Sequence, residues 1–193
     1  EAAQYRDEVL KMEELLKDRR GNLTLTNING LCRIALDKLK KTYEQDIQEK
    51  NIRIVFDNLT LSLMMEVNVE QFSKVLAGIL KNSMYALLKK SETVTFSPEI
   101  FLGLKVNKDM LEITIRDNGS GIDENTKDKI FAPFFTTKTT GEAAGVGLYL
   151  CREIVQNHRG TIEVESKKGE YTQFLITIPV YQPKTITPPK EEE

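Results

Sequence analysis

The chain has 193 residues, which is enough for one hydrophobic core of ordinary size, and we expect a single main domain. Its formal net charge of −2 gives no general attraction to nucleic acid or to an anionic membrane, so a nucleic-acid function is disfavoured. No apolar run could span a bilayer, no signal peptide is visible, and the chain begins with Glu1, so we expect a piece of a longer protein. Cys32 and Cys151 stand outside any CxxC or Cys/His cluster and are expected to be buried thiols.

Three helices are expected in the first half of the chain. Residues 1–20 carry apolar side chains in steps of three and four, the spacing of a helix packed along another helix, and predict a helical stub. A second amphipathic helix is expected at about 29–49, followed by an alternating strand in "NIRIVFDN". A third helix is expected from Asn68, which can cap it, to about Lys90.

The second half is rich in strands. Two strands are expected at 100–106 and 111–116, and a long polar, glycine- and threonine-rich stretch at 123–145 is typical of a functional lid or of disorder. A helix is expected at 146–157, and strands in "TIEVES" and "TQFLITIP" complete the domain. Residues 182–193 are proline-rich and charged, and we expect them to be disordered.

The strand at 111–116 runs into Asp117-x-Gly119-x-Gly121. A carboxylate can only accept hydrogen bonds, and glycines let a flat ring approach the backbone. Adenine offers an amine donor where guanine offers an acceptor, so this loop suits adenine. From these residues alone a tight Asx-turn without a ligand is equally favoured, while a calcium loop fits poorly because glycines occupy two ligand positions.

Two further motifs point to phosphate and its metal. Asn82 lies at the edge of the apolar stripe of the third helix, with Lys89 two turns further along, and its amide oxygen could ligate Mg²⁺. Taken alone, such an asparagine is usually just solvated. Gly145 and Gly147 lead into a helix, and glycine-rich backbone at a helix N-terminus can bind an anion, although neither the Walker nor the dinucleotide pattern is present.

In this order the motifs resemble the catalytic, ATP-binding domain of bacterial sensor histidine kinases, within the superfamily that includes gyrase, heat-shock chaperone and mismatch-repair ATPases. The resemblance covers about residues 1–180, and "PFFTTK" with "NSMYAL" looks closest to the nitrogen-regulator type. The four matching boxes are Asn82, then Asp117 with Gly119 and Gly121, then Phe131 with Phe134 and Phe135, then Gly145 with Gly147.

The resemblance implies an α/β two-layer sandwich, with a mixed β-sheet packed on three main helices, a flexible ATP lid and an N-terminal helix stub. Residues 1–20 would end the dimerisation and phosphotransfer helix, 23–181 would form the ATP-binding catalytic domain, and 182–193 the tail. Its cofactors would be ATP and Mg²⁺, with Asn82 and Lys138 catalytic and Asn82 the metal ligand. Nucleotide contacts are implied for Asn82, Tyr85, Lys89, Asp117, Gly119, Gly121, Ile122, Phe131, Thr137, Lys138, Gly145, Val146, Gly147, Leu148 and Thr172.

The implied reaction is transfer of the γ-phosphoryl group of Mg-ATP to a histidine outside this chain. The implied partners are an upstream phospho-acceptor hairpin, a response regulator and a second copy in a cytoplasmic full-length homodimer, with a membrane reached only through parts absent here. His158, the one histidine, is expected to be structural because it lies at a helix end. Two alternatives stay open: a nucleotide-sensing module without transfer activity and an anti-sigma-type serine kinase.

Two residues depart from the family pattern. Gly78 stands where hydrolytic members carry a general-base glutamate, which argues against a gyrase-like ATPase and against transfer to a hydroxyl. Tyr85 stands where many sensor kinases have a cation, so Lys89 or Lys138 is expected to supply positive charge for the phosphates.

Overall fold

The computed structural model describes residues 6, 7, 9–11, 13, 14, 23–133, 135 and 147–181. The described residues between 6 and 14 are helical, as the stub prediction requires. The elements that follow are β1 (Thr24–Asn27), α2 (Ile28–Thr42), α3 (Glu44–Lys50), β2 (Arg53–Asp57), β3 (Met64–Val67), α4 (Val69–Ser91), β4 (Glu99–Asn107), β5 (Met110–Asp117), α5 (Glu124–Lys127), α6 (Gly147–Asn157), β6 (Thr161–Lys167) and β7 (Tyr171–Pro179).

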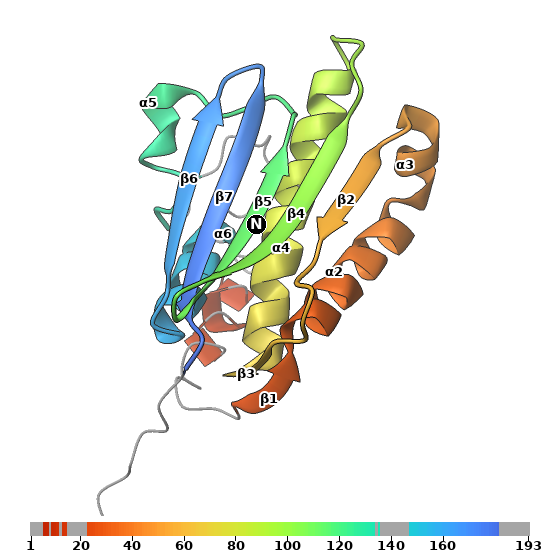
Figure 1. Cartoon of the computed structure of the whole chain (residues 1–193). Coiled ribbons are helices and arrows are strands. Elements are labelled where there is room, and N and C mark those ends of the chain that lie inside the picture. The colour runs from red at the N-terminus through yellow and green to blue at the C-terminus, as the bar shows by residue number, and fades with distance from the viewer. Residues whose placement is uncertain are drawn as a thin grey trace, which may run out of the picture.

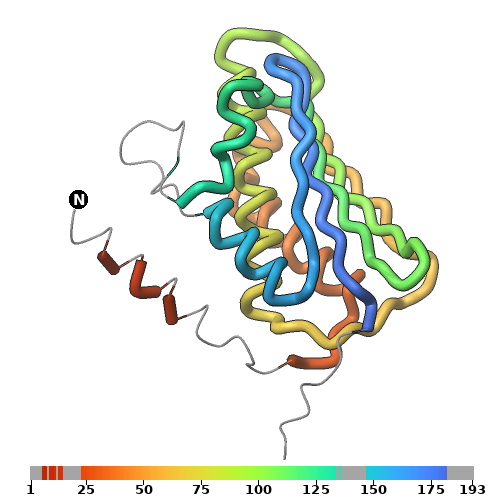
Figure 2. Tube along the Cα trace, turned by 90° about the vertical axis from the view of Figure 1, so that its left-hand side faces the viewer, coloured from red at the N-terminus to blue at the C-terminus, as the bar shows by residue number. Residues whose placement is uncertain are grey.

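The main body has two layers. Five strands form one sheet in the order β2-β4-β5-β7-β6, in which β2 runs parallel to β4 and the other neighbours are antiparallel. Helices α2, α4 and α6 cover one face of this sheet (Figure 1), and the side view separates the helical layer from the strands (Figure 2). The predicted sandwich of a mixed sheet on three main helices is therefore confirmed.

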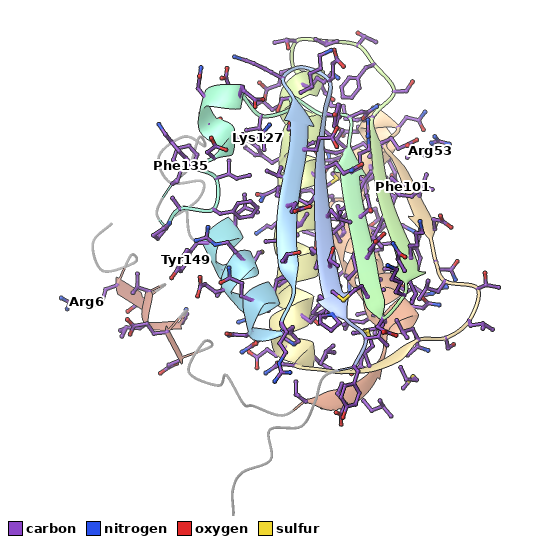
Figure 3. The ribbon with its side chains drawn as sticks, turned by 60° about the vertical axis from the view of Figure 1, so that its left-hand side comes forward. Arg6, Arg53, Phe101, Lys127, Phe135 and Tyr149 are labelled. Atoms are coloured by element: carbon purple, nitrogen blue, oxygen red, sulfur yellow. The ribbon has the colours of Figure 1, made fainter. Side chains whose placement is uncertain are left out.

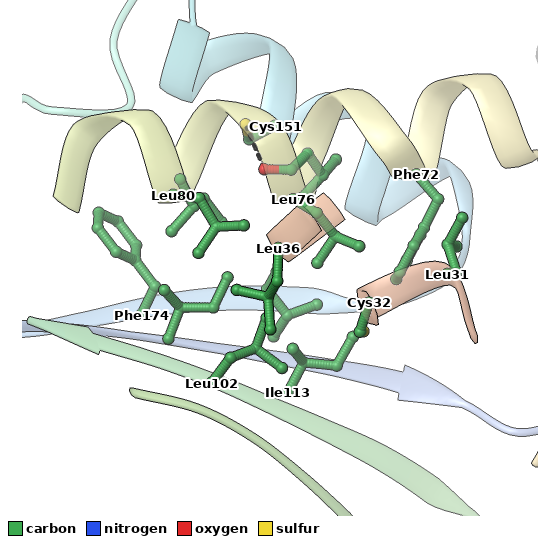
Figure 4. Packing of buried hydrophobic residues seen from close by; sticks show 14 of the residues in the cluster. Leu31, Cys32, Leu36, Phe72, Leu76, Leu80, Leu102, Ile113, Cys151 and Phe174 are labelled. Atoms are coloured by element: carbon green, nitrogen blue, oxygen red, sulfur yellow. Dashed lines mark hydrogen bonds between the residues drawn. The ribbon is translucent and has the colours of Figure 1, made fainter. Parts of the chain in front are cut away.

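Helix α4 is the centre of the helical layer, and its sequence explains its ends. The Asn68 side chain accepts a hydrogen bond from the backbone N–H of Gln71 at 3.1 Å, which caps the first turn. Phe72, Leu76 and Leu80 then point toward the sheet, where they meet Leu102, Ile113 and Phe174 (Figure 4). Burial of each such side chain contributes about 1.5–3 kcal/mol, so this face fixes α4 over the central strands.

Strand β5 lies in the middle of the sheet between β4 and β7. Its inward side chains are Leu111, Ile113 and Ile115, and the same alternation puts Asp117 on the inward face at the end of the strand. An apolar strand therefore delivers a single carboxyl group to the edge of the core.

Three local predictions differ from the structure. The helix expected at 29–49 is two helices, because the chain turns at Tyr43, and the turn lets Tyr43 and Ile47 both pack on the core. Strands β1 and β3, which pair antiparallel, were not predicted, since four-residue strands carry little pattern. The stretch at 123–145 begins with the one-turn helix α5, which the Asp123 side chain caps through the N–H of Asn125.

The remaining fold-level predictions concern the cysteines, the tail and membrane spans. Cys32 and Cys151 are free and buried, which confirms the prediction of buried thiols, and burial raises the pKa of each thiol to about 12. The tail at 182–193 lies outside the described residues. Among the described helices, none has the length and apolar character needed to cross a bilayer.

Candidate functional site

Asp117 is the centre of the site. Its side chain is 3% exposed, and Oδ1 accepts a hydrogen bond from the backbone N–H of Gly119 at 3.0 Å. Burial raises the pKa of the Asp117 carboxyl to about 6, against the opposing effects of the Gly119 N–H, Ser83, Lys90 and Arg116. An ionisable group with such a pKa at the edge of a core is typical of a functional site.

Ser83 on α4 faces this carboxyl. Its hydroxyl lowers the pKa of Asp117, yet the Ser83 Oγ is buried and makes no hydrogen bond of ordinary geometry within the described residues. A buried hydroxyl without a partner is costly unless water or a ligand satisfies it. Ser83 and Asp117 together therefore form a polar spot in an otherwise apolar region.

The two glycines of the loop are required by packing. A Cβ atom at Gly119 would lie 2.6 Å from the backbone carbon of Ala86 on α4. Gly121 has a φ of 65° and its Cβ would overlap the backbone oxygen of Lys167. The sequence analysis relates these glycines to the approach of a flat ring. The structure shows a requirement that involves no ligand, because the loop packs tightly between α4 and the β6–β7 turn.

Hydrogen bonds hold the outer side of the loop. The Asn118 side chain donates to the carbonyl of Ser97 and accepts from the N–H of Glu99, both at 2.8 Å. Lys90 Nζ donates to the carbonyl of Asn118 at 2.8 Å and lies 4.4 Å from the centroid of the Phe96 ring. These contacts fix the backbone that follows Asp117, so the carboxyl has a defined position.

Thr172 lies beside Asp117, as the resemblance implied. The two residues are paired in the register of β5 and β7, so their side chains share the inward face. Thr172 Oγ1 is 3.1 Å from Ser166 Oγ, and Ser166 Oγ accepts from the N–H of Ile122 at 2.8 Å. Ser166 therefore joins the β6–β7 hairpin to the glycine loop.

The structure also gathers the predicted residues of α4 along one edge. Asn82 and Tyr85 are half-buried, and the exposed Lys89 has its Nζ 5.8 Å from the centroid of the Tyr85 ring. Asn82 is the neighbour of Ser83 in α4, and Ser83 faces the Asp117 carboxyl. The edge of α4 that carries Asn82, Tyr85 and Lys89 therefore begins next to Asp117. In the described part of the chain no cluster of three or more His, Cys, Asp or Glu side chains could hold a metal, so an Mg²⁺ ion here would depend on few protein ligands.

The aromatic segment packs on the body next to α6. The Phe131 ring meets the Phe174 ring edge-on, with centroids 6.3 Å apart, and Phe135 packs against the core. The Arg152 guanidinium carbon lies 5.9 Å from the ring centroids of both Phe131 and Tyr149. Figure 3 shows Lys127, Phe135 and Tyr149 along this side of the molecule.

Of the second glycine pair, Gly145 and Gly147, only Gly147 lies within the described residues. Gly147 is the first residue of α6, and a Cβ there would meet nothing within 4 Å among the described atoms, while Leu148 packs on the core. Five predicted residues lie outside the described residues: Phe134, Thr137, Lys138, Gly145 and Val146.

The comparisons with known proteins agree with this geometry. Residues 68–182 match the family described as histidine kinase-, DNA gyrase B-, and HSP90-like ATPase. The chain belongs to this ATPase family. The match begins at the cap of α4 and ends just after β7, so it contains every residue of the site described in this subsection.

The chain is also similar in sequence to curated sensor kinases and in fold to a solved histidine kinase catalytic domain. The chain is 28% identical to the sensor histidine kinase ZraS of Salmonella typhi over 172 residues, covering 89% of the chain and 34% of ZraS. It is 35% identical to cyanobacterial phytochrome A of Nostoc sp. over 149 residues, covering 76% of the chain and 18% of that protein. The catalytic domain of the histidine kinase ThkA superposes with a TM-score of 0.66 at 28% identity, covering 81% of this chain and 95% of that one. The chain thus spans 34% of one of these two curated relatives and 18% of the other.

Within the ATPase family, the departure at Gly78 has a structural explanation. A Cβ at Gly78 would lie 3.3 Å from Cys151 Sγ on α6, and this sulfur lies 3.9 Å from the carbonyl of Val75. Gly78 therefore allows α4 and α6 to pack closely, and it offers no side chain that could act as a base. The assignment to the nitrogen-regulator type stays a prediction.

The sequence analysis missed several residues of the site. Ser83, Lys90, Asn118 and Ser166 were not predicted to support Asp117. Ser166 and Ile122 are 44 positions apart, and Lys90 and Asn118 are 28 apart, so no local spacing connects them. The only available signal was the proximity of Ser83 to the predicted Asn82.

Proposed function

We propose that this chain is an ATP-binding kinase domain that transfers the γ-phosphoryl group of Mg-ATP to a histidine outside it, in two-component signalling. The observation that carries the proposal is the buried Asp117 carboxyl at the end of β5, in a chain of the ATPase family. A buried acceptor beside the Ser83 hydroxyl, which makes no hydrogen bond of ordinary geometry to another described residue, fits a heteroaromatic edge that offers both a donor and an acceptor, as adenine does.

Each part of the site has a role in this proposal. Asp117 accepts from the adenine amine, and the loop fixed by Lys90 and Asn118 keeps the carboxyl in place. Asn82 ligates Mg²⁺, and Lys89 with Lys138 provides positive charge for the phosphates. When bound, Mg-ATP supplies the phosphoryl group and charge neutralisation, so the protein contributes mainly positioning.

Gly78 supports a histidine acceptor. An imidazole is nucleophilic near neutral pH, whereas water or a serine hydroxyl needs a general base, which Gly78 cannot provide. We therefore propose that the partners are a phospho-acceptor helical hairpin, a response regulator and a second copy in a full-length homodimer located in the cytoplasm. A response regulator would receive the phosphoryl group in turn.

The binding step is tested by calorimetry with Mg-ATP. Asp117→Asn should weaken binding about 10- to 100-fold, because a hydrogen bond to a charged group is worth about 1.5–3 kcal/mol. GTP should gain little. Asp109→Asn, an exposed change in the β4–β5 turn, is the matched control and should bind normally. Unchanged ATP affinity in Asp117→Asn would remove Asp117 from the site.

The transfer step is tested by the chemistry of the label. With labelled ATP and the acceptor hairpin supplied, acid-labile and base-stable label is expected, as for phosphohistidine. Acid-stable label would instead indicate a serine kinase. ATP binding without any label would indicate a nucleotide-sensing module.

A further inference from the structure

The peptide group between Asn118 and Gly119 is hydrogen-bonded at both of its ends. Its carbonyl oxygen, on Asn118, accepts from Lys90 Nζ at 2.8 Å. Its N–H, on Gly119, donates to Asp117 Oδ1 at 3.0 Å. This peptide is trans, so its C=O and N–H point in opposite directions within one rigid plane. By binding the oxygen, Lys90 therefore sets the direction of the N–H that holds the Asp117 carboxyl.

The Lys90 side chain is itself held in place. It lies in the last turn of α4 and is half-buried. Its ammonium nitrogen is 4.4 Å from the centroid of the Phe96 ring, which is close enough for cation–π attraction, and this ring packs against the core. The helix, the aromatic ring and the Asn118 carbonyl therefore restrain the ammonium together, unlike that of a lysine on an open surface.

The other polar groups of Asn118 bind the chain at the start of β4. Its side chain donates to the Ser97 carbonyl and accepts from the Glu99 N–H, both at 2.8 Å, and its own N–H donates to the Glu99 carbonyl at 3.4 Å. These bonds attach Asn118 to the sheet side. Lys90 attaches its carbonyl to α4, the helix that also carries Asn82.

Lys90 also places a positive charge near Asp117. Burial raises the pKa of the Asp117 carboxyl to about 6, and among the described residues Lys90 and Arg116 are the charged groups that oppose this rise. Arg116 precedes Asp117 in β5, so its side chain points to the opposite face of the sheet. The register partners of Asp117, Ile100 on β4 and Thr172 on β7, are uncharged. Lys90 is thus the cation that acts on the carboxyl from the helical side.

We propose that Lys90 is a positioning residue for the nucleotide, which orients the Asn118–Gly119 peptide and places its charge so that Asp117 binds the ligand as a carboxylate with one oxygen already held. The inference rests on the proposed ATP site and adds to it a lysine that acts through Asp117. A carboxylate fixed in this way loses less conformational freedom when a ligand binds. The ammonium also polarises the peptide, which strengthens the bond from its N–H to Asp117.

Lys90→Met tests this role, because it keeps the length of the side chain and its contact with Phe96 but removes the donor and the charge. Calorimetry with Mg-ATP at pH 8 should show a dissociation constant about 3- to 10-fold higher, the effect of about one hydrogen bond. The ratio of the variant to the wild-type constant should grow as the pH falls to 6.5, since Asp117 of the variant takes up its proton at a higher pH. Protonation of the nucleotide is common to both proteins and cancels in this ratio.

The charge of Asp117 can also be followed without nucleotide. An NMR titration of the Asp117 side-chain carboxyl in the whole chain should have its midpoint at about 6 in the wild type. In Lys90→Met the midpoint should be higher by at least about half a pH unit. Lys90→Arg keeps a donor and a charge, so it should restore the affinity and the midpoint toward the wild-type values.

Lys74→Met is the matched control. Lys74 is exposed on the same helix, 16 positions before Lys90, which corresponds to about 24 Å along the helix axis. The same substitution there should change neither the ATP affinity nor the Asp117 midpoint.

A second variant keeps the test decisive if Lys90→Met does not fold. Phe96→Leu removes the aromatic ring but keeps an apolar side chain, so Lys90 loses a restraint and keeps its charge. The ATP affinity should fall about two- to fivefold, the effect of a cation–π contact. The midpoint of the Asp117 titration should change much less than in Lys90→Met.

Two outcomes would overturn this inference alone. One is an unchanged ATP affinity in Lys90→Met, or in Phe96→Leu where that variant takes its place. The other is weaker binding by Lys90→Met with an unshifted Asp117 midpoint and a ratio that does not depend on pH, as expected if Lys90 only stabilises the fold. In both, a wild-type chain that binds ATP leaves the proposed function intact. A wild-type chain that does not bind ATP would overturn the proposed function and the role of Lys90 with it.

Discussion

Asp117 is a residue that the free protein accommodates at a cost. Its ordinary pKa of 3.8 rises to about 6 in the folded chain, mainly because of burial. The folded state therefore binds the proton more tightly than the unfolded state does. The stabilising contribution of the protonated form is fully present below pH 3.8 and is lost as the pH rises through 6. Above pH 6 the free protein keeps an ionised, buried carboxyl.

Asp117→Asn should consequently stabilise the free protein while it weakens ATP binding. A difference of roughly 2 between the two pKa values corresponds to at most about 3 kcal/mol, and an amide can still accept from the Gly119 N–H. Urea unfolding without nucleotide should show the variant about 1–3 kcal/mol more stable than the wild type at pH 8. This difference should nearly vanish at pH 4.

The exposed control Asp109→Asn should show no such pH-dependent gain. A loss of stability in Asp117→Asn that is equal at pH 8 and pH 4 would mean that the carboxyl is a structural group and not a strained binding group.

At the same scale, the residues that we propose to contact the nucleotide could be named from the sequence, whereas those that support Asp117 could not. Asp117 follows an alternating strand and has two glycines at fixed spacing, so its position was readable from one segment. Lys90 and Ser166 act across 28 and 44 positions, and their roles depend on how α4 and the β6–β7 hairpin meet the loop. Such contacts are set by tertiary packing, which leaves no pattern in either segment.

At the scale of elements, His158 connects the end of α6 to the start of α4. Its Nε2 accepts from the backbone N–H of Asn68 at 3.1 Å, so Nδ1 carries the proton and donates to the carbonyl of Ile154 at 2.8 Å. The imidazole also meets the Phe72 ring edge-on, with centroids 5.7 Å apart. The neutral imidazole thus accepts the backbone hydrogen bond of Asn68, the residue that caps α4. This contact confirms the predicted structural role of His158 at the end of α6.

Protonation of His158 should loosen this junction. Burial lowers the pKa of the imidazole below its ordinary 6.5, so the unfolded state binds the proton more tightly than the folded state. This contribution to stability is present above pH 6.5 and is lost as the pH falls toward the lowered pKa. His158→Gln should cost about 1–3 kcal/mol at pH 8, through the weakened bond to Asn68, and much less at pH 5.

The pH 5 and pH 8 unfolding free energies of both proteins provide the measurement. Protonation of Asp117 favours the folded state, whereas protonation of His158 favours the unfolded state. The difference in unfolding free energy between the wild type and His158→Gln is therefore the quantity to compare at the two pH values. A difference that does not shrink on acidification would contradict a neutral, hydrogen-bonded His158.

Helices and strands could be predicted where their own sequence contains a capping residue or a long apolar pattern. Helix α4 has a capping asparagine and a long apolar stripe, so its ends were predicted to within about one residue. The turn at Tyr43 depends on how the side chains of α2 and α3 pack on the core. Strands β1 and β3 pair although about forty residues separate them along the chain. Neither feature follows from periodicity within one segment.

For the whole molecule, the fold and the family were accessible because the site is built from boxes that keep their order along the chain. The sandwich brings Asn82 on α4 and the Asp117 loop to the same end of the helical layer, and Ser83 joins them. The sequence could not show that the two glycines serve packing, since that reason lies in the distance between the loop, α4 and the β6–β7 turn.

The phosphotransfer behaviour of the isolated chain follows from where its histidine lies. The chain should bind Mg-ATP without labelling itself, because its one histidine is 3% exposed and both ring nitrogens are engaged. Adding a dimeric phospho-acceptor hairpin, in trans or by fusion, should restore transfer at least in part, since the parts need only meet in a productive geometry. Asn82→Ala should reduce the magnesium-dependent part of ATP binding and this transfer together. Self-labelling of the isolated chain that His158→Gln abolishes would show that the α4–α6 junction opens to expose the imidazole, and would place the acceptor inside this domain.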